Sequence, residues 1–154
     1  MSRAFVKDDD NGGSEPLPDR PISPHANLVT PEGLAAIERQ LADLAERHAA
    51  AFEAKDRDAL GSIARDLRYW NARRASAQVV KAPHAPSGVA FGTTVTISRD
   101  DGRRQTWRIV GEDEADPAQG RLSYVSPVAQ ALMGKRIGDV VRAGNSDAEI
   151  VAIA

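Results

Sequence analysis

The feature that most constrains this chain is a pair of apolar heptad seams separated by only a few polar residues. In each seam the side chains recur at alternating spacings of three and four, as on a helix that packs along one narrow stripe. The first seam contains Leu34, Ile37, Leu41, Leu44, His48 and Ala51, and the second contains Leu60, Ile63, Leu67, Trp70, Arg74 and Ala77. So short a connection makes two helices antiparallel neighbours. The sequence therefore predicts an antiparallel coiled-coil hairpin over residues 29–80, a finger about 30–37 Å long.

The start of this finger and its charges support the prediction. Thr30 is a suitable N-cap, and Pro31 fits the first helical position, where its missing N–H costs nothing. Residues 30–54 carry five acidic and two basic side chains, whereas residues 55–80 carry six basic and three acidic ones. The two arms can therefore pair through opposite charges along their flanks.

A basic edge follows the second arm at Arg65, Arg68, Arg73 and Arg74. One interpretation is that these side chains pair with the acidic first arm, and this is the interpretation we favour. The other is that they meet RNA or the acidic wall of a channel.

Composition limits the classes of function. The net charge of -2 lies within residues 1–29, because acidic and basic residues balance over the remainder. This balance argues against binding of free duplex DNA through bulk electrostatics. The chain has no cysteine, which excludes disulfides and thiolate metal sites. Its apolar runs are too short to cross a bilayer and its N-terminus lacks an apolar signal region. We therefore expect a cytoplasmic protein without a membrane partner.

Beyond the finger the apolar period changes from that of a helix to that of a strand. Alternating residues predict strands over 94–98 and 105–110 around the turn Asp100–Gly102, and further strands over 121–125, 139–142 and 148–153. Ser126 caps a short helix that Gly134 ends. The predicted fold class is α+β, with a disordered or extended Pro-rich leader over residues 1–28, a linker over 81–88 and an antiparallel β domain with one short helix over 89–154.

The tip of the finger holds the residues with the clearest chemical potential. Asp56 and Asp58 lie where the chain reverses, and two carboxylates at the end of a rigid arm can hold a divalent cation. The alternative is that either aspartate caps the second helix and favours its dipole. The three histidines lie in the leader, the finger and the linker, so no intrinsic metal site is expected from them.

Several segments of the chain resemble the Gre family of transcript-cleavage factors, which bind bacterial RNA polymerase. The segment Thr30–Gly33 ahead of a heptad helix is similar to the start of these proteins. Residues 126–139 match the family pattern Ser-Pro-x-Ala-x-Ala-Leu-x-Gly-Lys-x-x-Gly-Asp position for position. The resemblance covers residues 28–154, and the leader that begins Met1–Phe5 is more similar to the GreB branch.

The resemblance implies an FKBP-like C-terminal domain that docks at the rim of the polymerase secondary channel. Polymerase-binding candidates carried over from the motif are Ser126, Pro127, Leu132, Gly134, Lys135 and Gly138. It also implies a monomeric factor whose coiled coil enters the channel and meets the nascent RNA 3′ end. DNA binding is implied only by family association. The factor is not an enzyme by itself, because its tip helps to position the Mg²⁺ of the polymerase, which then hydrolyses backtracked RNA.

The chain departs from the family at the tip. It lacks the acidic Ser-Glu-Asn motif that the family carries there, and Asp56 and Asp58 are the only substitutes. The hairpin is also shorter, as in the Rnk-like relatives, and losing ten residues from each arm withdraws a tip by roughly 15 Å. Two interpretations therefore stay open, a factor that stimulates cleavage of backtracked RNA and one that occupies the channel without cleavage. A general protein-interaction module is a further alternative.

Overall fold

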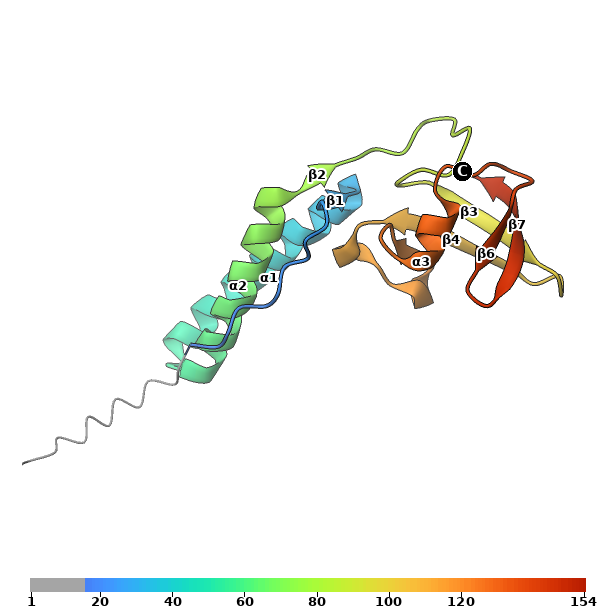
Figure 1. Cartoon of the computed structure of the whole chain (residues 1–154). Coiled ribbons are helices and arrows are strands. Elements are labelled where there is room, and N and C mark those ends of the chain that lie inside the picture. Colours follow the sequence, from blue (N-terminus) through green and yellow to red (C-terminus); the bar gives the residue numbers. More distant parts are fainter. Residues whose placement is uncertain (1–15) are drawn as a thin grey trace, which may run out of the picture.

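The structure, a computed structural model, describes residues 16–154. Two antiparallel helices, α1 (Pro31–Glu53) and α2 (Arg57–Ser76), form the finger, which projects from a β domain (Figure 1). The Thr30 hydroxyl caps α1 by accepting a hydrogen bond from the Gly33 amide at 3.0 Å. Leu44, Ala51 and Ile63 form the buried centre of the seam. The predicted coiled-coil hairpin is confirmed.

The last part of the predicted leader, residues 16–27, is an extended segment without helix or strand. This segment, here called the strap, lies along α2 in Figure 1. Arg68 donates to the Asp19 carboxylate at 2.5 Å, and the Arg20 guanidinium lies 3.9 Å from the centre of the Tyr69 ring. Prolines lower the conformational entropy that such a segment loses on docking, so a few polar contacts suffice to hold it. Residues 1–15 of the predicted leader lie outside the described part.

A short parallel strand pair joins the strap to the exit of the finger. Strand β1 (Leu28–Val29) pairs with β2 (Gln78–Val79), so the segment that enters α1 and the segment that leaves α2 lie side by side at the base of the finger. Val29 is buried there. The chain then crosses to the β domain through an irregular segment that includes the predicted linker, residues 81–88.

The β domain is a five-stranded sheet with the order β5-β4-β3-β7-β6. Its strands are β3 (Thr94–Arg99), β4 (Arg104–Val110), β5 (Arg121–Ser123), β6 (Val140–Ala143) and β7 (Ser146–Ile153). The prediction of a wholly antiparallel sheet is wrong at one place, because β4 and β5 are parallel. The connection through two 3₁₀ turns, η1 (Glu112–Glu114) and η2 (Pro117–Gln119), carries the chain back before β5 begins.

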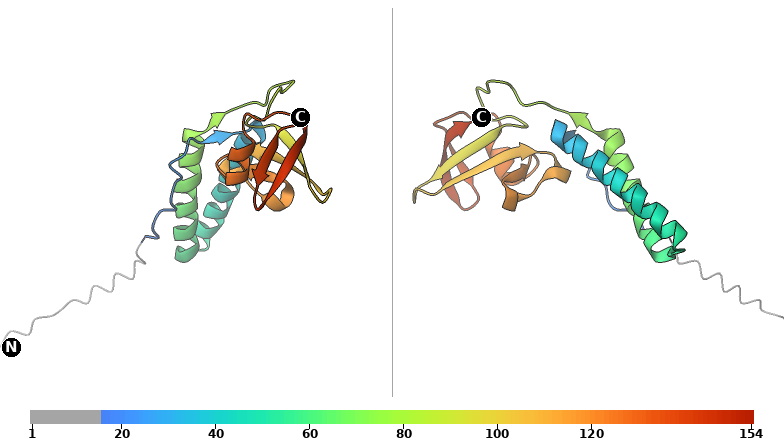
Figure 2. Two further views of the ribbon diagram at one scale, coloured as in Figure 1. Left: turned by 45° about the vertical axis from the view of Figure 1, so that its right-hand side comes forward. Right: turned by 180° about the vertical axis from the view of Figure 1, so that it is seen from behind.

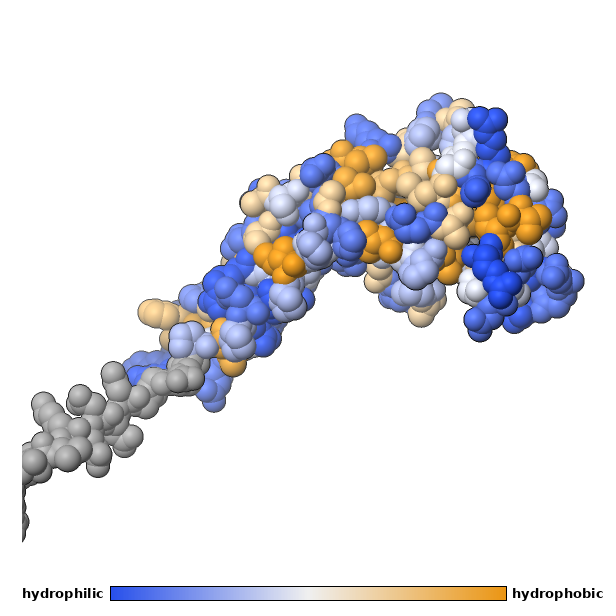
Figure 3. Space-filling model, in the orientation of Figure 1, coloured by the Kyte–Doolittle hydropathy of each residue, from blue (hydrophilic) through white to orange (hydrophobic). Residues whose placement is uncertain are grey.

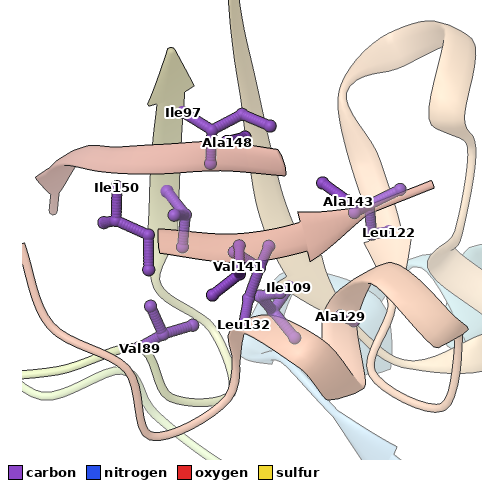
Figure 4. Close-up of a cluster of buried hydrophobic side chains, with 11 residues drawn as sticks. Val89, Ile97, Ile109, Leu122, Ala129, Leu132, Val141, Ala143, Ala148 and Ile150 are labelled. Carbon is purple, nitrogen blue, oxygen red and sulfur yellow. The ribbon is translucent and has the colours of Figure 1, made fainter. Parts of the chain in front are cut away.

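The short helix α3 (Pro127–Leu132) covers the sheet and completes its core. Figure 4 shows Leu132 and Ala129 of α3 directed toward the buried side chains of the strands. Ile97, Ile109, Leu132 and Ile150 are all fully buried in this cluster. Ser126 caps α3 and Gly134 follows it with a φ of +78°, as the sequence predicts. None of the helices within residues 16–154 combines the length and the apolar character needed to cross a bilayer.

Candidate functional site: the finger and its joint with the β domain

The tip of the finger is a tight, exposed turn. Lys55 adopts a left-handed conformation with a φ of +55°, and Asp56 then caps α2 by accepting a hydrogen bond from the Ala59 amide at 3.1 Å. Asp58 lies in the first turn of α2, where its charge favours the helix dipole. Within residues 16–154 no group of three or more His, Asp or Glu side chains is arranged to hold a metal ion. Asp56 is therefore engaged in the fold, while Asp58 faces solvent.

Sequence reasoning missed an exposed aromatic residue beside this turn. Phe52 is 69% exposed at the C-terminal end of α1. Phe52 lies outside the heptad seam, and this position was the sequence signal that its side chain is exposed. Figure 3 shows hydrophilic residues over much of the visible face of the finger, interspersed with smaller hydrophobic areas, and larger hydrophobic areas at its base and on the β domain. Among the large hydrophobic side chains of residues 16–154, Phe52 has the largest exposed fraction.

The arginines of the predicted basic edge have different partners. Arg65 lies 3.5 Å from its neighbour Asp66 on α2, and Arg68 bonds to Asp19 of the strap. Arg73 is almost completely buried, with 2% of its side chain exposed, and pairs with the β domain. Only Arg74 pairs with the acidic first arm among the described residues, at 3.6 Å from Glu38, so the favoured interpretation of this edge holds at Arg74 and is wrong for the other three.

Arg73 connects the base of the finger to the β domain. Its Nε donates to the Asp113 carboxylate of η1 at 2.6 Å, and its Nη2 donates to the Asn27 side chain at 2.7 Å. The Tyr69 hydroxyl donates to the other Asp113 oxygen at 2.5 Å. Burial and this hydrogen bond to Asp113 raise the pKa of Tyr69 to about 12. A buried charge held by several partners fixes geometry strongly, because removing one partner leaves the other unpaired.

A second connection caps the first turn of α1 from the β domain. The Glu114 carboxylate accepts hydrogen bonds from the Thr30 amide at 3.0 Å, from the Thr30 hydroxyl and from the Gly111 amide at 3.3 Å. A Cβ atom on Gly33 would lie 2.2 Å from the Glu114 side chain, so glycine leaves the space that this carboxylate occupies. The anion also favours the positive end of the helix dipole. We call the contacts of Glu112–Glu114 with the finger base the joint.

The residues carried over from the C-terminal motif divide between packing and surface. Leu132 is fully buried in the core, so it is unable to touch a partner directly and its place among the binding candidates is corrected. Ser126 caps α3, while Gly134 and Gly138 hold positive φ values and bond to Val89 and Ile150. Pro127 and Lys135 are exposed. The motif thus shapes a rigid surface more than it supplies contacts.

Two exposed apolar residues extend this surface beyond what the motif indicated. Ile137 is 62% exposed in the loop after α3, and Val140 is 65% exposed at the start of the edge strand β6. Each directly follows a charged residue, Arg136 or Asp139. We call these two residues and the exposed Lys135 of the same segment the amphipathic patch.

Comparison with known proteins decides the family. Residues 84–154 match the family model described as "Transcription elongation factor, GreA/GreB, C-term". Over 135 residues the chain is 39% identical to the transcription elongation factor GreA of Thioalkalivibrio sulfidiphilus, covering 80% of this chain and 82% of that protein. The chain belongs to the GreA/GreB family. It is also 41% identical over 97 residues to the transcription elongation factor GreB of Neisseria meningitidis, which covers 59% of this chain and 60% of that protein.

The chain is also similar to proteins of known structure. The crystal structure of GreA factor homolog 1 of Thermus thermophilus covers 84% of this chain and 99% of that protein, at 18% identity and a TM-score of 0.42. A GreA/GreB elongation factor from Nitrosomonas europaea covers 82% of this chain at 22% identity and a TM-score of 0.41. Because the match to the Thioalkalivibrio sulfidiphilus factor covers 80% of the chain, it includes the finger as well as the β domain.

Proposed function

We propose that this chain is a transcription elongation factor that binds bacterial RNA polymerase at its secondary channel. The observation that carries the proposal is a rigid finger fixed to an anchoring β domain by the buried joint at Arg73 and Glu114. The 23 residues of α1 correspond to an arm of about 34 Å. Membership of the GreA/GreB family supports this function, because the relatives bear the name of transcription elongation factors.

The factor modulates elongation by occupying the channel and does not supply a set of metal ligands at its tip. Asp56 supports this choice, because its carboxylate is engaged as the cap of α2. Asp58 is exposed to solvent, and its neighbour Arg57 offsets its charge. The protein therefore needs no cofactor of its own, and any hydrolysis of RNA uses the Mg²⁺ of the polymerase. It acts as a monomer in the cytoplasm, where its partners are RNA polymerase and the RNA 3′ end within the complex.

A backtracked transcription complex tests this function. Purified polymerase is halted on labelled RNA, and the factor is added with magnesium. The expected result is saturable binding and altered elongation without release of short 3′ RNA fragments. Fragment release that disappears in Asp56→Ala plus Asp58→Ala would replace the occupancy mechanism with cleavage stimulation. Absence of binding would refute the proposed function altogether.

The tip variants need a control for folding, because Asp56 is a cap. Asp56→Asn keeps an acceptor for the Ala59 amide while removing the charge. If fragment release occurs and survives in Asp56→Asn, the aspartate acts through the fold. If release is lost while the helix content is unchanged, its charge is needed in the channel.

A further inference from the structure

A cleft lies between the first half of α1 and the connection from β4 to β5. It comprises a hollow of about 480 Å³ and an adjacent one of about 300 Å³, which share Gly33, Ala36, Asp113 and Glu114 in their lining. Figure 2 shows that the N-terminal half of α1 faces this part of the β domain. Small-molecule and peptide sites commonly have volumes of about 300–1,000 Å³. The cleft is therefore large enough to receive a short segment of another molecule.

The carboxylates in the cleft are already used by the fold. Asp113 accepts from Arg73 and Tyr69, and Glu114 accepts from Thr30 and Gly111. Glu32 lies 3.3 Å from Arg108, and its pKa is lowered by a backbone hydrogen bond and by that guanidinium. The acceptors that face the cleft are therefore engaged, and little remains to attract a cation.

The guanidinium groups in the cleft have donors to spare. Arg108 donates through Nε and Nη2 to Gly92 and Glu32, and Arg121 donates through Nε to the Glu114 carbonyl at 3.0 Å. The nearest carboxylate to the Arg121 Nη2 atom, that of Asp116, is 3.9 Å away. Arg39 lines the cleft from α1 and forms no ion pair with any carboxylate of residues 16–154. Guanidinium groups bind carboxylates through paired, charge-assisted hydrogen bonds.

The wall of the cleft that α1 forms contains small residues, which give an incoming chain access to these guanidinium donors. Gly33 and the exposed Ala36 follow one another by one helical turn, and Ile37 and Trp70 lie deeper in the second hollow. Such a wall suits the close approach of a polypeptide backbone and one apolar side chain. A phosphodiester chain suits it less, because it carries a negative charge at every nucleotide and some would face Glu32, Asp113 and Glu114, whereas a polypeptide can place its few carboxylates opposite the arginines alone.

We propose that the cleft between the finger and the β domain binds an acidic polypeptide segment of RNA polymerase, whose carboxylates pair with Arg39, Arg108 and Arg121. The inference rests on the proposed function and adds a second contact, separate from the patch around Lys135 and Ile137. In this arrangement the segment sits at the junction of the finger and the anchor. It therefore sets how far the finger extends past the rim.

Charge reversal at Arg39 tests the inference. Arg39 is exposed and lies outside the joint, so a measurement of helix content is enough to check that the Arg39→Glu variant is folded. We expect binding to core polymerase to weaken about tenfold, which corresponds to roughly 1.4 kcal/mol. The matched control is Arg103→Glu, a reversal at another exposed arginine in the turn between β3 and β4, where Arg103 pairs with Asp101. Equal affinities for the wild type and Arg39→Glu would overturn the inference while the proposed function stands.

A photoreactive side chain at Ala36 identifies what occupies the cleft. A crosslink in the polymerase complex to a segment rich in aspartate or glutamate would support the inference, and Arg39→Glu should then reduce its yield. A crosslink to RNA or DNA, to a polymerase segment without carboxylates, or to nothing would overturn it. If the wild type fails to bind polymerase at all, the proposed function fails together with this inference, so the two failures are distinguishable.

Discussion

The first turn of α1 has no room for a side chain at Gly33 while Glu114 occupies its place. In Gly33→Ala the new Cβ would lie 2.2 Å from the Glu114 side chain. The carboxylate is the mobile end of a flexible side chain, so it can swing away without moving the backbone. When it does so it loses its hydrogen bonds to Thr30 and Gly111. The expected damage is therefore electrostatic, and the joint opens without a change in the core of either module.

The magnitude follows from two opposing terms. Hydrogen bonds to a charged group contribute about 1.5–3 kcal/mol, and the displaced carboxylate recovers part of this from water. Replacing glycine by alanine in a helix gains up to about 1 kcal/mol. We expect Gly33→Ala to lower the free energy of unfolding of the finger by about 1–2 kcal/mol. In a Glu114→Ala background only the gain remains, so the same substitution should stabilise the protein.

The assay is a double-mutant cycle on Gly33 and Glu114. A Trp107→Phe background leaves Trp70 as the only tryptophan, so its fluorescence reports on α2 during urea unfolding. We expect a coupling free energy of about 2–3 kcal/mol between the two positions. If Gly33→Ala instead stabilises the protein equally in both backgrounds, Glu114 does not occupy the first turn of α1 and the reasoning is refuted.

Three further predictions concern the joint and the finger. Arg73→Met removes the buried cation and leaves the Asp113 carboxylate without its ion pair, so it should lower the free energy of unfolding by about 3–5 kcal/mol in urea titrations. The double variant Arg73→Met with Asp113→Leu should recover much of this loss. Gly61→Ala, at a helical position where an added Cβ meets no atom within 4 Å, should raise the free energy of unfolding by about 0.5–1 kcal/mol, and a loss would show that the position is crowded. The pKa of Tyr69 is raised from 10.0 to about 12, so its neutral form contributes stability below pH 10 that is lost as the pH rises toward 12. Ultraviolet titration of the wild type and of Tyr69→Phe should therefore show that Tyr69 does not ionise near pH 10.

The finger could be predicted from the sequence because its information is local. Alternation of three and four residues fixes which side chains meet across two helices, and Leu44 and Ile63 are buried as that pattern requires. The N-caps of α1 and α3 could also be predicted from the sequence, because Thr30 and Ser126 each precede a proline at the first helical position. Such signals depend on neighbours within one or two turns.

The joint could not be predicted in the same way, because its partners are far apart along the chain. Glu114 lies 84 residues from Thr30, and nothing near either residue specifies the other. Arg73 was interpreted as part of an exposed edge because it lies among other arginines and off the seam. The one local signal was Gly33, a poor helix former in the first turn of a strong helix. A glycine in that place indicates that something else approaches the helix closely.

The joint strongly affects the position of the tip, because it fixes the base of a long rigid arm. An arm of about 34 Å that rotates by about 10° at its base moves its end by roughly 6 Å. Apolar packing tolerates such rotations by repacking, whereas the bonds of Arg73 and Glu114 have direction and are lost when either partner turns away. The proposed entry of the finger into a narrow channel beside a docked domain requires this angular precision. The ionic joint, the glycine that admits Glu114 and the strap that braces α2 are therefore parts of one device for aiming the tip.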